Sequence, residues 1–271
     1  LTSSAISLPT DLWLPVTRRF EPPVSHQVAA GTGFLIPGDL EVTVEAFYKT
    51  MDNLIEYKEG AFFGGTGAGW ESKVEKGRGW AYGAEFMIEK SYGKLTGWIG
   101  YTLSWTMRKF DNLNFGRTFP AKYDRRHDIS VALTHKFNDR VDMGLVWVYG
   151  TGNAATLGAS DYPPEDFFSD GYYYSSVTDF PGRNNYRMPS YHRLDLGVNL
   201  HKQKKNGIRT WSFSVYNAYN RLNPFFIYWG TEWVQEPDPD NPAEILYYGR
   251  PVLKKVSVFP IIPSVSYAFK F

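Results

Sequence analysis

Alternation of apolar and polar residues with a period of two runs through most of this chain, and it restricts the fold more than any other feature. It is clearest in residues 264–271, where one parity is apolar or aromatic and the other is polar or small: Val265, Tyr267, Phe269 and Phe271 against Ser264, Ser266, Ala268 and Lys270. Successive side chains of a β-strand point to opposite faces, so this segment predicts a strand with one apolar and one polar face.

Eight further runs with the same period precede it, which gives nine predicted strands. They cover residues 25–36, 40–48, 80–89, 95–105, 128–137, 141–149, 193–200 and 211–216. Trp98 is an exception, because it falls on the polar parity of its run. No segment shows a convincing helical period. Strands separated by turns at this density predict an all-β fold, either a barrel or a sandwich.

The connections between these strands favour a barrel. Tight-turn sequences at residues 37–39, 92–94, 138–139 and 204–207 alternate with long connections at about 58–76, 111–121, 151–187 and 233–247. Outer-membrane barrels have short periplasmic turns and long extracellular loops, whereas nothing in a sandwich requires that order. With Phe271 placed at the periplasmic end, each connection falls on the expected side.

Hydropathy and aromatic content are compatible with strands that cross a membrane. Mean hydropathy is −0.37, and no stretch approaches the roughly 18 apolar residues of a membrane helix. A membrane barrel averages out as polar, because lipid-facing and lumen-facing residues alternate. Aromatic residues make up 17% of the chain, and several lie near predicted strand ends, as at Trp80, Trp105 and Trp147. A membrane interface favours such aromatics, and a soluble β-sandwich is the alternative.

Charge and residue types argue against several function classes. The net charge is +1, with 29 basic and 28 acidic residues, which argues against a nucleic-acid-binding surface. The chain has no cysteine, so it has no disulfide and no thiolate metal site. Its five histidines are scattered, and neither a catalytic triad nor a zinc-binding spacing is recognisable. We therefore predict no enzymatic activity, no metal site and no cofactor.

Two segments carry a more specific signal. Residues 189–196 read Pro-Ser-Tyr-His-Arg-Leu-Asp-Leu, and residues 216–224 read Tyr-Asn-Ala-Tyr-Asn-Arg-Leu-Asn-Pro. Together with residues 79–85 and 123–129, they resemble the C-terminal barrel of TonB-dependent outer-membrane receptors. The closing residues 259–271 resemble the variant found in Bacteroidetes. The resemblance spans about residues 25–271, nearly the whole chain.

This resemblance implies a transmembrane, antiparallel, up-and-down β-barrel that is integral to the outer membrane of a Gram-negative cell. Such barrels have about 22 strands and a plugged lumen. Nine strands would leave two open edges, which do not persist in hydrocarbon. We therefore expect residues 25–271 to be the C-terminal part of a larger barrel and residues 1–24 to be an extracellular loop segment. The plug and the earlier strands of such a receptor would lie in another chain or region. The chain begins at Leu1 without a recognisable signal peptide, so either the mature protein starts here or the sequence is a fragment of something longer.

The function that the resemblance implies is energy-coupled uptake of a scarce solute, such as a siderophore, a vitamin, a glycan or a peptide. The expected partners are outer-membrane lipids, the rest of the receptor, TonB acting through the plug, and a surface lipoprotein of the kind that pairs with Bacteroidetes receptors. No nucleic-acid partner is expected. The alternative function is a passive porin or a structural barrel of an outer-membrane secretion or adhesion assembly.

Candidate site residues come from the loops and from the polar faces of the strands. Aromatic side chains with polar neighbours suit sugars, aromatic chelates or peptides, and loop 151–187 offers Tyr172, Tyr173, Tyr174 and Arg183 as ligand contacts. Packing of these tyrosines over the barrel mouth is an equal alternative. Four charged residues are predicted to face the lumen, as salt bridges of the wall or as contacts for the plug: Asp124, Arg126, Arg193 and Asp195.

Overall fold

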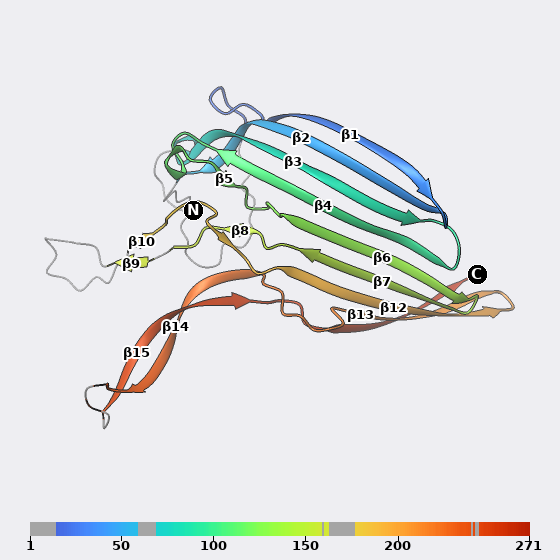
Figure 1. Ribbon diagram of the computed structural model, residues 1–271. Coiled ribbons are helices and arrows are strands. Elements are labelled where there is room, and N and C mark those ends of the chain that lie inside the picture. Colours follow the sequence, from blue (N-terminus) through green and yellow to red (C-terminus); the bar gives the residue numbers. More distant parts are fainter. Residues whose placement is uncertain (1–14, 59–68, 159, 163–176, 240, 242–243) are drawn as a thin grey trace, which may run out of the picture.

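The computed structural model describes residues 15–58, 69–158, 160–162, 177–239, 241 and 244–271, and its regular elements are almost all strands (Figure 1). One antiparallel sheet follows the order β1-β2-β3-β4-β6-β7-β12-β13-β16, and β5 pairs with β4 outside this path. The strands of the path are β1 (Val24–Ile36), β2 (Leu40–Tyr57), β3 (Val74–Lys90), β4 (Leu95–Lys109), β6 (His127–Asn138), β7 (Val141–Gly150), β12 (Tyr191–Lys204), β13 (Gly207–Tyr216) and β16 (Ile262–Lys270). They correspond to the predicted strands.

Short elements surround the end of the sheet that carries the long connections. They are η1 (Trp70–Lys73), η2 (Asn114–Gly116), β5 (Phe119–Pro120), β8 (Ala154–Ala155), β9 (Ser160–Tyr162), β10 (Val177–Asp179) and β11 (Tyr186–Arg187). β8 pairs with β11, and β9 pairs with β10. The tight turns and the C-terminal end of the chain lie at the opposite end (Figure 1). The sheet therefore has a turn end and a loop end, as the alternation of connections predicts.

The strand register brings the predicted apolar sets together on one face of the sheet. Directly opposite residues of an antiparallel pair share a face. From β2 to β12, one row of such partners reads Val42, Ile88, Ile99, Val131, Trp147 and Leu194. From β12 to β16, a second row reads Val198, Phe213 and Val265. We call this side the apolar face and the opposite side the polar face.

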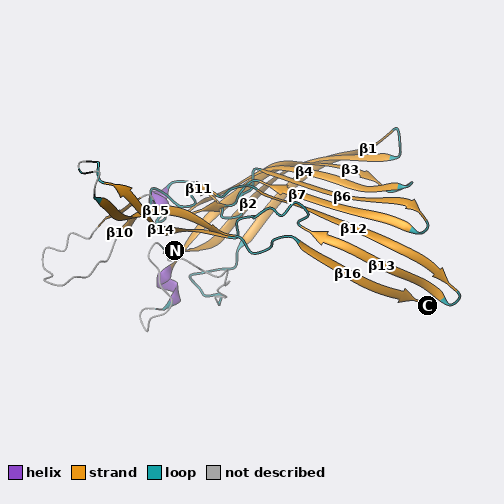
Figure 2. Cartoon of the chain, turned by 90° about the horizontal axis from the view of Figure 1, so that it is seen from below, coloured by secondary structure: helices purple, strands orange, loops and turns teal. Residues whose placement is uncertain are grey.

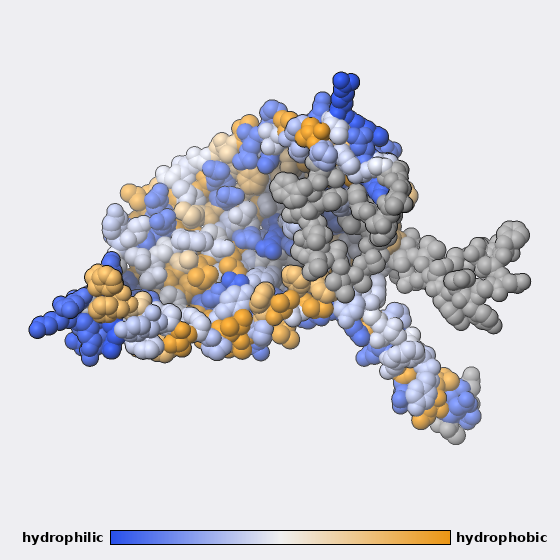
Figure 3. Space-filling model, turned by 180° about the vertical axis from the view of Figure 1, so that it is seen from behind, coloured by the Kyte–Doolittle hydropathy of each residue, from blue (hydrophilic) through white to orange (hydrophobic). Residues whose placement is uncertain are grey.

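The sheet is curved and open. Within the described residues, β1 pairs only with β2 and β16 pairs only with β13. The strands form a twisted surface (Figure 2), which is hollowed when it is seen from behind (Figure 3). This is part of a barrel wall, in agreement with the predicted fold class. Both edge strands keep unpaired backbone groups, and such groups are costly at membrane depth.

The tight turns depend on residues that tolerate a left-handed backbone or a close approach of two chain segments. Gly38 has φ 98° and Asp39 has φ 57°, and together with Pro37 these residues join β1 to β2. Glycine adopts the left-handed region without steric cost, and Asp tolerates it better than most residues. A second turn residue, Gly207, cannot be replaced without movement, because a Cβ there would lie 2.1 Å from the carbonyl oxygen of Lys270.

β2 and β3 are both longer than the predicted runs, and a bulge in β2 reverses its side-chain parity. The register shifts between Met51 and Leu54, and Asn53 in between has φ 58°. Beyond the bulge, Leu54 pairs with Gly77, so the even-numbered residues of β2 now point to the polar face. An extra residue in one strand re-aims the side chains that follow it. A simple period-two search therefore ends at the bulge.

A small buried cluster lies beside this extension, at the loop end. Phe110, Leu113 and Phe119 are buried, and Leu54 packs against them. A Cβ on Gly77 would lie 2.3 Å from the ring of Phe110, so the cluster depends on a glycine in β3. This packing fixes the segment that follows β4 against the ends of β2 and β3.

A hairpin within the last long connection was not predicted. β14 (Phe226–Pro237) pairs with β15 (Ile245–Val256) in a separate two-stranded sheet. It extends away from the loop end of the barrel wall (Figure 1). Gly230 and Pro251 interrupt its sequence pattern, and both strands are edges, where proline is tolerated. Both ends of the predicted connection at about 233–247 thus belong to strands.

Candidate functional site

Two groups of polar side chains on this wall contain the predicted site residues that the structure describes. The loop-end network has two ion-paired parts, Asp124 with Arg126 and Arg187, and Glu56 with Arg183. The wall pair consists of Arg193 and Asp195, on the polar face of β12.

Asp124 is the shared partner of Arg126 and Arg187 in the loop-end network and is 1% exposed. Its Oδ1 accepts a hydrogen bond from the Thr106 N–H at 2.6 Å, and its Oδ2 pairs with Arg187 and, at 3.5 Å, with Arg126. Arg187 also donates to the carbonyl oxygens of Asp124 and Gly152. A buried carboxylate needs such partners. Asp124 therefore fastens segment 121–126 and β11 to the end of β4.

Arg126 contacts both the network and the apolar face. Its Nη1 donates to the Ser104 carbonyl at 3.0 Å, and its guanidinium lies 4.5 Å from the ring centroid of Trp105. Trp105 belongs to the apolar face and stacks on Tyr82, with the ring centroids 5.2 Å apart. Arg126 therefore contacts groups on both sides of the sheet at its loop end. A lumen-facing role for Arg126 stays a prediction.

Arg183, a predicted ligand contact, is only 8% exposed. Its Nη2 donates to the Tyr57 carbonyl at 2.7 Å, and its Nη1 lies 3.8 Å from Glu56. Its backbone N–H donates to Asn114 Oδ1 at 2.9 Å. These contacts join the end of β2 to two loops. A contact of Arg183 with a ligand stays a prediction, and Tyr172, Tyr173 and Tyr174 lie outside the described residues.

The wall pair forms a salt bridge on the polar face. Arg193 Nη2 lies 2.9 Å from Asp195 Oδ2, and Arg193 Nη1 donates to the hydroxyls of Tyr191 and Tyr216 at 2.8 Å each. The guanidinium also lies 4.2 Å from the ring centroid of Tyr216. Asp195 has a further partner, because its Oδ1 accepts the Asn217 N–H at 2.9 Å. These groups are mutually satisfied, and contact with a plug stays a prediction.

Asn217 is a buried structural residue whose role the sequence motif did not reveal. It has φ 53°, a left-handed conformation that Asn tolerates better than most residues. Its Nδ2 donates to the carbonyls of Arg221 and Phe259 at 2.9 and 3.1 Å, and its Oδ1 accepts the Arg221 N–H at 2.9 Å. Asn217 therefore ties the end of β13 to the wall pair and to the segment that leads into β16.

The other asparagines of the same motif act in the same way. Asn220 Oδ1 accepts the Ile261 N–H at 2.9 Å. Asn223 accepts the His192 N–H at 3.1 Å and donates to the His192 carbonyl at 2.9 Å. Asn side chains readily replace backbone partners in turns. Three asparagines at one strand end were therefore the sequence signal from which this structural role could have been predicted. The asparagines of this motif therefore stabilise the loop end by hydrogen bonds to backbone groups of neighbouring segments.

The hairpin β14–β15 has two unlike faces. On one face Arg250 donates to Glu232 at 2.8 Å, and this hydrogen bond lowers the pKa of the Glu232 carboxyl. Tyr248 donates to Glu236 at 2.8 Å, which raises the pKa of the Tyr248 hydroxyl. The charges of this face are thus largely paired within the hairpin.

The opposite face of the hairpin is aromatic and open. Trp233 is 77% exposed and Tyr247 is 68% exposed. Trp229 lies on the same face, and its Nε1 donates to the Gly158 carbonyl at 3.2 Å. Gly249 is the partner of Trp233, and a Cβ there would meet the indole ring at 3.6 Å. Exposed aromatics of this kind offer flat surfaces for a ligand or a partner.

The described residues contain no group of three or more His, Cys, Asp or Glu side chains arranged to hold a metal ion. In the same residues, no helix is long and apolar enough to cross a membrane.

The family model described as "TonB dependent receptor-like, beta-barrel" matches residues 8–220. Among solved structures, the chain is similar in fold to the closed form of the ferric-catecholate import receptor Fiu from K12 E. coli, with a TM-score of 0.51 and 13% sequence identity. The alignment covers 93% of this chain but 29% of that one, so the chain spans less than a third of that receptor. The curated proteins gave no match.

Proposed function

The chain belongs to the TonB-dependent receptor-like β-barrel family, and from this premise we propose that it is the C-terminal part of an outer-membrane receptor that imports a solute with energy delivered through TonB. One observation carries the proposal: within the described residues, a single antiparallel wall has its apolar sets on one face, and each of its two edge strands is paired on one side only. The apolar face lies against lipid, and the polar face lines the lumen.

The first proposed partner is the rest of the barrel, which the two open edges of the wall require. β1 and β16 pair with the remaining strands of the barrel, because only a closed barrel satisfies all backbone groups in hydrocarbon. The lumen then holds a plug. The residues proposed to face this lumen, where they can contact the plug, are Asp124, Arg126, Arg193 and Asp195. TonB acts through that plug, and residues 1–24 form an extracellular segment. The Bacteroidetes-like closing residues support a surface lipoprotein as an additional partner.

The solute is captured at the loop end. Tyr172, Tyr173, Tyr174 and Arg183 are the proposed contacts within loop 151–187. The exposed face of the hairpin adds a second group, Trp229, Trp233 and Tyr247. Aromatic rings beside polar groups suit a siderophore, a vitamin, a glycan or a peptide. The solved relative imports a ferric catecholate, and the likeness to it supports the barrel rather than a choice among these classes.

The test is uptake with and without TonB. Cells that produce the whole protein receive one labelled probe at a time: a ferric catecholate, cobalamin, an oligosaccharide or an oligopeptide. We expect one probe to accumulate above the level of cells without the protein. Deleting TonB, or collapsing the proton-motive force with an uncoupler, should reduce that accumulation to background.

Binding and transport are measured separately in the same cells. We expect surface binding of the accumulated probe to survive the loss of TonB, because capture needs only the loops. Accumulation that persists unchanged without TonB would instead identify a passive porin. A protein found outside the outer-membrane fraction would reject the proposed placement itself.

A further inference from the structure

Two cations face each other at the loop end of the apolar face. Arg78 on β3 and Lys109 on β4 are direct cross-strand partners. Arg78 shares its parity with Trp80 and Tyr82, and all three lie on the apolar face. The Cβ atoms of such partners are about 5 Å apart, and like charges placed directly opposite each other are destabilising. An anion that contacts both side chains would therefore stabilise the pair, because it offsets the repulsion between the two cations.

The described part of the chain does not supply that anion. Neither Arg78 nor Lys109 forms an ion pair within the described residues, whereas the neighbouring Arg108 on the polar face pairs with Glu56 at 2.8 Å. Lys76, the next residue of β3 on the apolar face, lies 3.6 Å from Glu21, and both side chains are well exposed. An exposed pair of this kind is weak. The local charge on this side of the strand ends is positive.

The position of the pair fits the surface of a membrane. On β3, Lys90 and Arg78 bound the apolar run on this face and are 12 residues apart. That is about 40 Å along the strand and about 30 Å across a membrane at the usual tilt of about 40°. The hydrocarbon core has about the same thickness. Trp80, Tyr82 and Trp105 lie just inside the pair, as aromatic side chains do at the interface.

Neighbouring strands end differently on the same face. At the loop end, the apolar face of β6 finishes at His127, that of β7 at Tyr149 and that of β12 at His192. The cations are therefore a local feature of β3 and β4 and do not form a uniform ring around the wall.

We propose that Arg78 and Lys109 bind the phosphate group of an anionic lipid headgroup in the leaflet next to the long loops, with Lys76 beside them. The planar guanidinium of Arg78 donates two parallel hydrogen bonds to phosphate oxygens, and the ammonium of Lys109 adds a third donor. The phosphate also removes the repulsion between the two cations. This inference rests on the proposed placement of the apolar face in the membrane.

The test uses the whole protein, purified from outer membranes and stripped of lipid in a non-ionic detergent. The probe is diphosphorylated lipid A, and its dissociation constant is measured by native mass spectrometry. Dephosphorylated lipid A and inorganic phosphate are measured in parallel. The variant is Arg78→Gln with Lys109→Gln. The control is Lys202→Gln with Lys204→Gln, which removes two charges of the same parity from the turn end of β12.

We expect the dissociation constant of diphosphorylated lipid A to rise at least about tenfold in the first variant and to change little in the control. Wild-type protein should bind the dephosphorylated form weakly and inorganic phosphate far more weakly than the lipid. An unchanged constant in the first variant would reject the site. Equal losses in both variants, equal binding of the dephosphorylated form, or equally tight binding of inorganic phosphate would reject it as well.

A failure of the lipid-binding site can be distinguished from a failure of the proposed function. Folding of each variant is checked by the shift of its unheated form on an electrophoresis gel. Lipid binding that does not respond to the variant, together with TonB-dependent uptake, would reject only this site. A protein absent from the outer-membrane fraction would reject both the site and the proposed function.

Discussion

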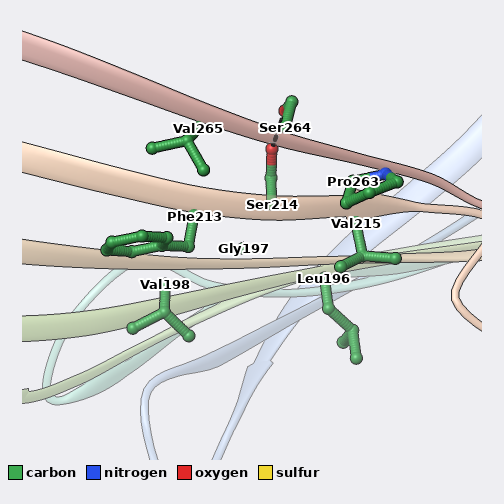
Figure 4. A pocket seen from close by; sticks show the side chains of 9 residues that line it. All are labelled: Leu196, Gly197, Val198, Phe213, Ser214, Val215, Pro263, Ser264 and Val265. Carbon is green, nitrogen blue, oxygen red and sulfur yellow. Dashed lines mark hydrogen bonds between the residues drawn. The ribbon is translucent and has the colours of Figure 1, made fainter.

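Phe213→Arg is expected to destabilise the protein in lipid vesicles by about 2–4 kcal/mol. Phe213 lies in the middle of the apolar run of β13, between its partners Val198 and Val265. These side chains border a shallow apolar hollow on the surface of the wall (Figure 4). Phe213 is 45% exposed in the isolated wall, and substitution of such a surface residue usually costs less than about 0.5 kcal/mol in a soluble protein. A large cost therefore indicates that lipid covers this face.

The matched control is Ser212→Arg, one residue earlier on the same strand. Ser212 pairs with Asn199 and Ser266 on the polar face. We expect a change of less than about 1 kcal/mol there, because lumen-facing substitutions affect selectivity more than stability. Both variants are unfolded with urea from vesicles of one lipid composition. Equal costs at the two positions would contradict the assignment of faces.

Asn217→Ala is expected to cost about 3 kcal/mol or more and to reduce the yield of folded protein. The substitution leaves the Arg221 N–H and the carbonyls of Arg221 and Phe259 without their side-chain partner. These hydrogen bonds are partly buried, and a lost intramolecular hydrogen bond costs about 0.5–1.5 kcal/mol, or up to about 3 kcal/mol where the group left behind is buried. Alanine must also adopt the left-handed conformation at φ 53°, which costs about 1 kcal/mol.

Asn217→Gly separates these two contributions. Glycine accepts the left-handed conformation but makes none of the side-chain hydrogen bonds. We expect it to be about 1 kcal/mol more stable than Asn217→Ala and still clearly less stable than the wild type. Urea unfolding in vesicles gives both values. An Asn217→Ala protein within about 0.5 kcal/mol of the wild type would show that this residue does not hold the loop end together.

The barrel wall could be predicted because its signal is local. Each long strand places apolar residues at alternate positions, so a run such as 128–137 already shows which residues share a face. The second half of β2 escaped because the bulge at Asn53 reverses that parity. The hairpin β14–β15 escaped because Gly230 and Pro251 interrupt its alternation. Patterns read along the chain cannot detect a strand whose period is broken.

The candidate site was less predictable because its contacts link distant segments. Asp124 and Arg187 are 63 residues apart, and Arg183 and Tyr57 are 126 apart. The sequence indicates that these residues are polar near strand ends, but it does not indicate which of them meet. Arg193 and Asp195 were easier, since residues two apart on one strand share a face. Their salt bridge is present in the wall.

The most direct test of the membrane-barrel account is the surroundings of Val131 and Ser130, adjacent residues of β6 on opposite faces. The chain has no cysteine, so Val131→Cys and Ser130→Cys each introduce one thiol into it. The thiol of each variant is labelled with a fluorophore, and the whole protein is folded into vesicles that contain brominated lipid. We predict strong quenching at residue 131 and little at residue 130, with a water-soluble maleimide reacting only at residue 130. Equal quenching at both positions, or quenching at residue 130 alone, would contradict a lipid-facing apolar side.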